Sequence, residues 1–415
     1  MKILAISHFL WFGGAQISTL EFLNEIKYKV KDYDIELKIV ICKGSGNITA
    51  LKSSLMHIEC YEAPCQTIMG YPIMDIGSAQ ELIEWADLVW ITDVEYLVAP
   101  RVKRLRRMPV VSHLHSYALI CPWWGAFYGF REVCLRRCSP WRIIRCKQGV
   151  NLELSKIGLL SGGRAGIYWL LDFIKGPFDF LRWRKLMDEV LESIDGFIYV
   201  SKAMRDVHVK HLPELESRPS AVVYNPVTEP LEHLRPNPGE PYGNYLLYAS
   251  GSNPIKGPHL LLKAWSAVSR ESRDLRLYMV DCKSSWVEGI AKKMNLKNVV
   301  FTEKLPSETY YQLMYRAKAV VMPSIWPEPF GRIPVEANRL GIPAVVTNRG
   351  ALPEIIENNT TGIISKARSE DLANAIVKAV SQKWDRGKVI GSFFKRVNPD
   401  KATDGLLKFF EELLR

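Results

Sequence analysis

The sequence predicts an α/β fold of two Rossmann-like, doubly wound domains, each with a parallel sheet between layers of helices. Short apolar runs alternate with amphipathic helical patterns along most of the chain, as is typical of buried parallel strands. The 415 residues are too many for one hydrophobic core of ordinary size. We therefore expect a first domain at residues 1–224, a second at 225–390 and a tail helix at 391–415.

The beginning of the first domain has the pattern of a strand, a glycine loop and a helix. Residues 1–7 form a short, mostly apolar run, Gly13 and Gly14 follow, and a helical pattern continues through Leu23. Two adjacent glycines allow a backbone to approach a ligand closely, although many strand-to-helix turns contain glycine. Met1 and Lys2 begin the chain like a signal peptide, but no small-residue cleavage site follows. No other apolar segment is long enough to span a membrane. We therefore expect a cytoplasmic protein.

The most informative segment of the second domain places two glutamates around a glycine turn that begins a helix. Residues 320–322 predict a buried strand, Gly331 a turn, and residues 333–340 a helix, with Glu328 before the turn and Glu336 on the helix. A helix N-terminus presents unpaired N–H groups and a positive dipole end, which suit a diphosphate. Ionised carboxylates on either side can accept hydrogen bonds from sugar hydroxyls. This arrangement is typical of a nucleotide-sugar site.

At residues 323–337 the chain resembles the retaining glycosyltransferases of the GT-B fold, family 4. The hallmark of that family is two glutamates separated by seven residues, with Pro-Phe-Gly after the first. The resemblance implies that the two domains face each other across a cleft and that the C-terminal helix crosses back to the first domain. It also implies that Glu328 contacts the donor sugar, that Glu336 contacts the ribose, and that the backbone of Phe330 and Gly331 lies near the diphosphate.

Other segments match the family in the same order along the chain. The resemblance places Gly13 and Gly14 beside the donor diphosphate and the acceptor. It also assigns His115 to the sugar or the reaction centre, at the end of the strand predicted at residues 110–117. His113 alternates with His115 and shares its face of the strand, so it stays an alternative for that role.

The chain departs from the family pattern at two positions that bear on the site. Ser116 stands where the family usually has aspartate after the histidine. Lys256 matches the lysine of the family that offsets charge on the leaving diphosphate. The arginine of the family, however, falls near Gly251, and residues 245–255 contain neither Arg nor Lys. We therefore expect the diphosphate to depend on Lys256 and helix N-termini, with help from Arg332.

The positive charge of the chain is concentrated in residues 101–190. This basic aromatic stretch contains 17 lysines and arginines against 6 acidic residues, so its net charge equals the +11 of the whole chain. Aromatic rings beside basic residues suit an anionic membrane surface, and they also suit single-stranded nucleic acid. Because the stretch lies in the domain expected to bind the acceptor, we favour a lipid-linked or glycan acceptor at a membrane surface and expect no nucleic-acid partner. Ordinary burial statistics assign about half of these rings to the core.

Four of the eight cysteines lie close together in the sequence. Cys121, Cys134, Cys138 and Cys146 fall within 26 residues, which leaves zinc binding and disulfides both open. Their spacing is not the paired Cys-x-x-Cys of zinc ribbons. The family resemblance favours a local structural clamp, a reducing cytoplasm disfavours disulfides, and we expect no metal in the active site.

The family resemblance implies a retaining, metal-independent glycosyltransferase of the hexosyltransferase type, and the basic aromatic stretch leads us to expect it to be peripheral at the cytoplasmic membrane. Its donor is expected to be a UDP-sugar or a GDP-sugar, and it needs no other cofactor. Two alternatives stay open. One is a transferase with a soluble acceptor, like glycogen synthase or sucrose-type enzymes. The other is a degenerate sugar-nucleotide-binding or nucleic-acid-binding protein without transferase activity.

Overall fold

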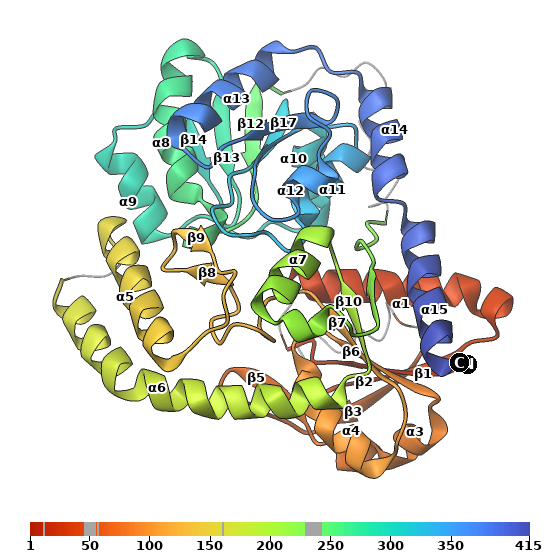
Figure 1. The fold of residues 1–415 in the computed structure, drawn as a ribbon. Coiled ribbons are helices and arrows are strands. Elements are labelled where there is room, and N and C mark those ends of the chain that lie inside the picture. The colour runs from red at the N-terminus through yellow and green to blue at the C-terminus, as the bar shows by residue number, and fades with distance from the viewer. Residues whose placement is uncertain (11–12, 45–54, 56–57, 160–161, 229–242) are drawn as a thin grey trace.

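The computed structural model describes residues 1–10, 13–44, 55, 58–159, 162–228 and 243–415, with the side chains of 30–32 and 162–174 left out. Two parallel sheets, each covered by helices, form the two halves of the molecule (Figure 1). This arrangement confirms the predicted α/β fold class.

The first sheet contains seven strands in the order β11-β10-β7-β6-β1-β2-β3, all parallel. The strand order reverses at β1, with β2 on one side and β6 on the other, and such a reversal is where doubly wound sheets bind ligands. The strands are β1 (Lys2–Ser7), β2 (Glu36–Cys42), β3 (Glu59–Ala63), β6 (Leu88–Thr92), β7 (Val110–Leu114), β10 (Gly196–Tyr199) and β11 (Ser220–Val222).

Helices and two small hairpins surround this sheet. The hairpins pair β4 (Cys65–Ile68) with β5 (Tyr71–Met74), and β8 (Phe127–Tyr128) with β9 (Glu132–Val133). The helices are α1 (Gly14–Tyr33), α3 (Gln80–Trp85), α4 (Ala99–Leu105), α5 (Pro140–Lys156), α6 (Gly162–Ser193) and α7 (Lys202–His211), with short 3-10 turns η1 (Ile76–Ala79), η2 (Glu95–Val98) and η3 (Pro213–Leu215).

The second sheet contains six parallel strands in the order β14-β13-β12-β15-β16-β17. Its strands are β12 (Tyr245–Tyr248), β13 (Arg276–Met279), β14 (Val299–Phe301), β15 (Ala319–Met322), β16 (Ala344–Thr347) and β17 (Gly362–Ser365). Its helices are η5 (Pro254–Lys256), α8 (Pro258–Glu271), α9 (Ser285–Lys293), α10 (Ser307–Arg316), α11 (Arg332–Arg339), α12 (Leu352–Ile355), α13 (Ser369–Ser381) and α14 (Arg386–Arg396).

The last helix, α15 (Pro399–Leu414), returns to the first domain and lies beside α1 (Figure 1). Its buried face includes Leu406 and Phe410, which belong to the same hydrophobic cluster as Phe22 and Trp90. The ring of Phe410 lies 5.8 Å from that of Trp90, measured between centroids. The C-terminal helix therefore crosses back as the family resemblance implies.

The basic aromatic stretch divides between core and surface. Phe180 and Trp183 on α6 are buried, and the indole N–H of Trp183 donates to the hydroxyl of Tyr71 at 2.8 Å. Trp141 on α5 and Phe178 on α6 are instead 70% and 74% exposed. The rings between residues 167 and 174 lie outside the described side chains. Among the described residues, no helix is long and apolar enough to cross a membrane.

The disulfide of the structure lies outside the four clustered cysteines, for which the sequence left zinc binding and disulfides open. A disulfide joins Cys42 to Cys65, with 5.4 Å between their Cα atoms. These two residues come together because Cys42 ends β2 opposite Ala63, which ends β3 two residues before Cys65. The four clustered cysteines, 121, 134, 138 and 146, are free thiols. Within the described part of the chain, no group of three or more His, Cys, Asp or Glu side chains is arranged to hold a metal ion.

Candidate active site between the two domains

Close backbone approaches bring the Lys256 loop and the Glu328 loop together. The backbone N–H of Ile325 donates to the carbonyl of Ile255 at 2.9 Å. Gly257 has φ +77°, and a Cβ there would lie 2.0 Å from the carbonyl oxygen of Pro323. Only glycine permits both this conformation and this approach, so the sequence pair Lys256-Gly257 fixes how the lysine meets the loop after β15.

The Glu328 carboxylate is buried and satisfied by three donors. One oxygen accepts from the Lys256 ammonium at 2.7 Å. The other accepts from the hydroxyl of Ser324 at 2.9 Å and from the indole of Trp326 at 2.7 Å. The Lys256 ammonium also lies 4.8 Å from the centroid of the Trp326 ring, a cation–π contact. The predicted sugar contact and the predicted diphosphate lysine thus form one charged pair.

Gly331 permits the turn that begins α11. Its φ is +91°, and a Cβ there would lie 2.5 Å from a methyl carbon of Leu352. Phe330, the residue before it, is buried and packs near Tyr224, with 6.1 Å between the ring centroids. The helix that follows therefore starts at Arg332, and its first backbone N–H groups lie next to the Glu328 loop.

Glu336 lies one turn into α11 and is held by two side chains. Its carboxylate accepts from the Tyr310 hydroxyl at 2.8 Å and pairs with Arg332, whose Nε lies 2.7 Å from Oε1. Burial raises the pKa of Glu336, and the Arg332 charge and the Tyr310 hydrogen bond act against this increase. The carboxylate predicted to contact the ribose is therefore already paired with an arginine and a tyrosine.

Arg332 reaches from the second domain to α1 of the first. Its guanidinium pairs with both carboxylate oxygens of Glu21, one of them at 2.7 Å, and lies 3.4 Å from the hydroxyl of Ser18. A Cβ placed on Gly14 would lie 4.0 Å from the side chain of Arg332. The glycine loop of Gly13 and Gly14 and the helix α11 therefore meet across the interface between the domains.

His115 follows the end of β7 and differs from its neighbour His113 in surroundings. His113 is completely buried between Phe22 and Trp90, with ring centroids 5.2 and 6.0 Å away. His115 is 9% exposed, and its Nε2 has no hydrogen-bond partner among the described residues. Burial lowers the pKa of His115 to about 3, so the imidazole is neutral at physiological pH. Of the two, only His115 has any access to solvent.

A buried polar cluster at the reversal of strand order was not identified from the sequence. His8 follows β1, and Asp93 and Glu95 follow β6. The Gln16 amide nitrogen lies 3.0 Å from Nε2 of His8 and donates to Asp93 at 3.1 Å. Burial raises the pKa of Asp93 to about 6 and that of Glu95 well above its usual range, and it lowers the pKa of His8 to about 4.

The signal that could have revealed this cluster is modest. Asp93 and Glu95 directly follow an apolar strand, where the carboxyl ends of parallel strands place side chains in the crevice. Gln16 belongs to the Gly-Gly-Ala-Gln segment, and its side-chain oxygen accepts from the backbone N–H of Gly13 at 3.1 Å. The glycine loop is therefore connected to the acidic cluster through one glutamine.

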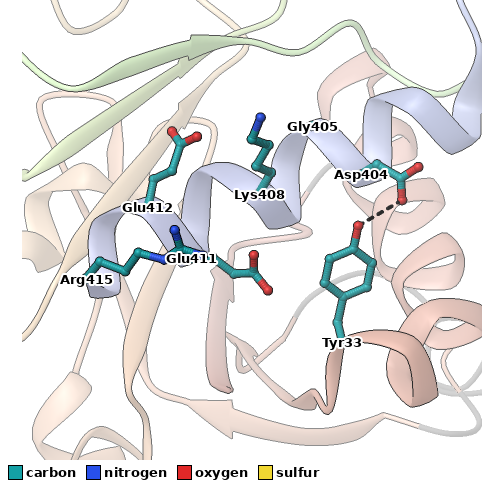
Figure 2. A pocket seen from close by; sticks show the side chains of 7 residues that line it. All are labelled: Tyr33, Asp404, Gly405, Lys408, Glu411, Glu412 and Arg415. Atoms are coloured by element: carbon teal, nitrogen blue, oxygen red, sulfur yellow. Dashed lines mark hydrogen bonds between the residues drawn. The ribbon is translucent and has the colours of Figure 1, made fainter.

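A separate pocket of about 350 Å³ lies between the end of α1 and α15. Figure 2 shows its lining, in which the hydroxyl of Tyr33 points toward Asp404 and donates to it at 3.4 Å. None of the predicted site residues lines this pocket. Its charged rim, which also includes Lys408, Glu411, Glu412 and Arg415, belongs to the packing of the C-terminal helix and not to the interface between the domains.

Comparison with known proteins bears on the second domain most directly. Residues 233–392 match the family described as glycosyl transferases group 1. A relative called putative glycosyltransferase YtcC, from Bacillus subtilis, is 26% identical over 244 residues, which cover 53% of this chain and 58% of that protein. Spore coat protein SA of the same organism is 27% identical over 142 residues, covering 32% of this chain and 38% of that protein. The chain thus matches about half the length of these relatives.

Two solved structures share the whole fold at low identity. The Anabaena protein HepE in complex with UDP-glucose has a TM-score of 0.65 and 17% identity, covering 100% of this chain and 99% of that one. The S. aureus protein TarM, solved with UDP and alpha-GlcNAc-glycerol, has a TM-score of 0.63 and 13% identity, with 99% of both chains covered. At these identities the likeness shows a common fold.

Proposed function

Because its second domain matches group 1 glycosyl transferases and both domains have the GT-B arrangement, we propose that this chain is a retaining glycosyltransferase. It transfers a hexosyl group from a UDP-sugar or GDP-sugar to an acceptor hydroxyl, without a metal ion. The observation that carries this proposal is the Lys256–Glu328 pair, 2.7 Å apart, beside the N-terminus of α11. A cation and a helix N-terminus on one side of a carboxylate suit a diphosphate that is bonded to a sugar.

In this proposal each charged group has a defined task. Lys256 and Arg332 stabilise the negative charge that grows on the diphosphate as the bond from the anomeric carbon to the phosphate oxygen breaks. Glu328 accepts a hydrogen bond from a hydroxyl of the sugar, and Glu336 accepts one from the ribose. The backbone N–H groups near Phe330 and Gly331 contribute the helix-terminus dipole.

The acceptor binds on the first domain, near Gly13, Gly14 and His115. Its oxygen forms the new bond on the face that the diphosphate leaves, and a diphosphate oxygen takes the proton of the acceptor hydroxyl. The configuration at the anomeric carbon is therefore retained, and no protein base is needed. A neutral His115 imidazole can donate or accept a hydrogen bond with a sugar hydroxyl, but it cannot supply a positive charge. Closure of the interface between the domains keeps out water that would hydrolyse the donor.

A lipid-linked or glycan acceptor at a membrane surface fits the outer face of the first domain. Trp123 is 52% exposed, and the Lys147 ammonium lies 4.5 Å from its ring centroid. Trp141 and Phe178 on the neighbouring helices are more exposed still. Exposed rings among basic residues favour anionic lipid headgroups. A soluble acceptor is the alternative, and it predicts full activity in the absence of lipid.

The test is a thermal-shift screen of nucleotide sugars followed by a transfer assay. A bound donor raises the melting temperature by mass action, so UDP-sugars and GDP-sugars are compared at equal concentration. The preferred donor is then incubated with lipid extract and with soluble glycans, with and without EDTA, and NMR of the product gives its anomeric configuration. Stabilisation without transfer or hydrolysis would favour a sugar-nucleotide-binding protein, inversion would exclude the retaining mechanism, and inhibition by EDTA would contradict metal independence.

A further inference from the structure

We propose that Glu21, on α1 of the first domain, is a positioning residue that holds Arg332 toward the donor diphosphate. The inference rests on the proposed function, and it concerns the second cation that the diphosphate needs. Residues 245–255 contain no Arg or Lys, so Lys256 has no cationic neighbour in its own loop. Arg332 is the described cation at the N-terminus of α11, and its guanidinium is fixed from the opposite domain.

The Glu21–Arg332 contact has the geometry of a specific pair. Two guanidinium nitrogens face two carboxylate oxygens, which is the bidentate arrangement that arginine favours and lysine cannot form. The two side chains are only 11% and 10% exposed, so solvent screens the interaction weakly. A buried pair of this kind fixes an orientation more than it adds net stability, because both charges lose their hydration.

Glu21 also binds the segment that connects the two domains. Its Oε1 accepts from the backbone N–H and from the hydroxyl of Thr228, both at 3.1 Å. One carboxylate therefore links α1, the interdomain connection and α11. If the two domains separate at this point, Arg332 loses the partner that directs it. The direction of Arg332 thus depends on the closed arrangement of the domains.

Arg332 is shared between two carboxylates, and this sharing indicates how a donor enters. Its Nε lies 2.7 Å from Glu336, while its terminal nitrogens pair with Glu21. When a ribose hydroxyl binds to Glu336 and the diphosphate approaches the guanidinium, these ligand contacts replace the contact between Arg332 and Glu336. The contact between Arg332 and Glu21 remains and keeps Arg332 beside Gly14. A Cβ placed on Gly14 would lie 4.0 Å from Cδ of Arg332. We infer that loss of Glu21 weakens the diphosphate contact and leaves the nucleoside contacts intact.

Calorimetric titration with UDP and UMP separates the diphosphate contact from the nucleoside contacts, because the two nucleotides differ only in the second phosphate. GDP and GMP are titrated in parallel. The variants are Glu21→Gln, which keeps an acceptor for Thr228 but lacks the charge, and Glu21→Asp, which keeps the charge. Glu25→Gln, one turn further along α1, is the matched control. We expect Glu21→Gln to weaken UDP or GDP binding by about 10- to 100-fold with little change for the monophosphate, Glu21→Asp to recover part of the loss, and Glu25→Gln to match the wild type.

The outcomes distinguish the inference from the function on which it rests. If the wild type binds neither UDP nor GDP, the proposed function fails and the inference fails with it. If the wild type binds a diphosphate and Glu21→Gln binds it equally well, only the inference is overturned. An equal loss for diphosphate and monophosphate also overturns it, because Glu21 would then act through the general fold. Should Glu21→Gln melt far below the wild type, Glu21→Asp and Arg332→Lys decide between these outcomes by the same diphosphate-to-monophosphate comparison.

Discussion

Glu328 and Glu336 are both buried carboxylates on one loop-helix segment, yet their partners differ. Glu328 accepts hydrogen bonds from Lys256, Ser324 and Trp326, whereas Glu336 pairs with Arg332 and accepts from Tyr310. A group beside the sugar gains importance as charge develops at the anomeric carbon, and a group beside the ribose acts equally before and during the reaction.

This difference predicts separable kinetic effects of the two glutamates. We expect Glu328→Gln to lower kcat more than donor affinity, and Glu336→Gln to raise the donor Kd while kcat at saturation changes little. Steady-state kinetics together with calorimetric donor binding measure both quantities. Negligible effects of both substitutions on both quantities would reject the assignment of these residues to the donor site.

Lys256 is expected to act on turnover through the leaving diphosphate. Replacement by alanine should lower kcat at saturating donor by about 100-fold or more, the range found for other electrostatic stabilisers of developing charge. Lys263→Ala, an exposed position on α8, serves as the control that keeps full activity. A Lys256→Ala variant that retains most of its turnover would mean that the diphosphate is held by other groups.

The raised pKa of Asp93 leads us to expect that the stability of the protein depends on pH. Burial raises its pKa in the folded protein to about 6, against about 3.9 in an unfolded chain. Between these values the folded protein keeps a proton that the unfolded chain has lost, so the Asp93 contribution to stability falls as pH rises from about 4 to about 6. Asp93→Asn lacks this titration. Its free energy of unfolding relative to the wild type should therefore increase by about 2 kcal/mol between pH 4 and pH 7, measured by urea unfolding. A pH-independent difference would show that Asp93 titrates normally.

At the scale of elements, the turn into α11 depends on one glycine conformation. Gly331 has φ +91°, and a Cβ there would meet Leu352 at 2.5 Å and Ile355 at 3.2 Å. We expect Gly331→Ala to lower the free energy of unfolding by about 1–3 kcal/mol and to weaken donor binding, because the helix start moves away from Glu328. Gly289→Ala on α9 is the matched control, since nothing lies within 4 Å of its Cβ position, and it should be neutral or stabilising. Thermal unfolding and donor titration of both variants check this.

The sequence could predict elements better than it could predict contacts between them. Apolar runs such as residues 320–322 and the glycine turn at Gly331 are local signals, and the structure contains β15 and α11 at these places. The Glu21–Arg332 pair joins residues 311 positions apart, so no periodicity or motif spacing could reveal it. The acidic cluster of Asp93 and Glu95 likewise depends on which strands become neighbours in the sheet.

The cysteines illustrate the same limit in another form. The sequence left zinc binding and disulfides open for Cys121, Cys134, Cys138 and Cys146, and in the structure all four are free thiols. The bonded pair, Cys42 and Cys65, comes from two segments that become neighbours because β2 and β3 pair in register. Strand register is a property of the folded sheet, and spacing along the chain does not report it.

At the scale of the whole molecule, the two helices that carry Trp141 and Phe178, the most exposed rings of the basic aromatic stretch, lie side by side. In Figure 1, α5 and α6 extend at the left of the first domain, whereas α1 and α15 pack together at the right. Trp141 and Phe178 on α5 and α6 are 70% and 74% exposed. Among the described side chains of α6, residues 175–193, Phe180 and Trp183 are buried and Phe178 is exposed, so a membrane-binding surface on this part of the helix uses the face that carries Phe178.

This surface gives the last prediction, peripheral binding to anionic bilayers. Each basic residue near a surface contributes about 1 kcal/mol, so a few of them together with inserted rings suffice for reversible attachment that weakens as salt rises. Trp141→Ser combined with Phe178→Ser should reduce co-sedimentation with phosphatidylserine-containing liposomes at low salt. Tyr28→Ser, at a ring 74% exposed on α1, is the matched control and should bind as the wild type does. If the double variant and the wild type sediment equally, or if the wild type stays in solution, the exposed rings serve another partner and the acceptor is a soluble molecule.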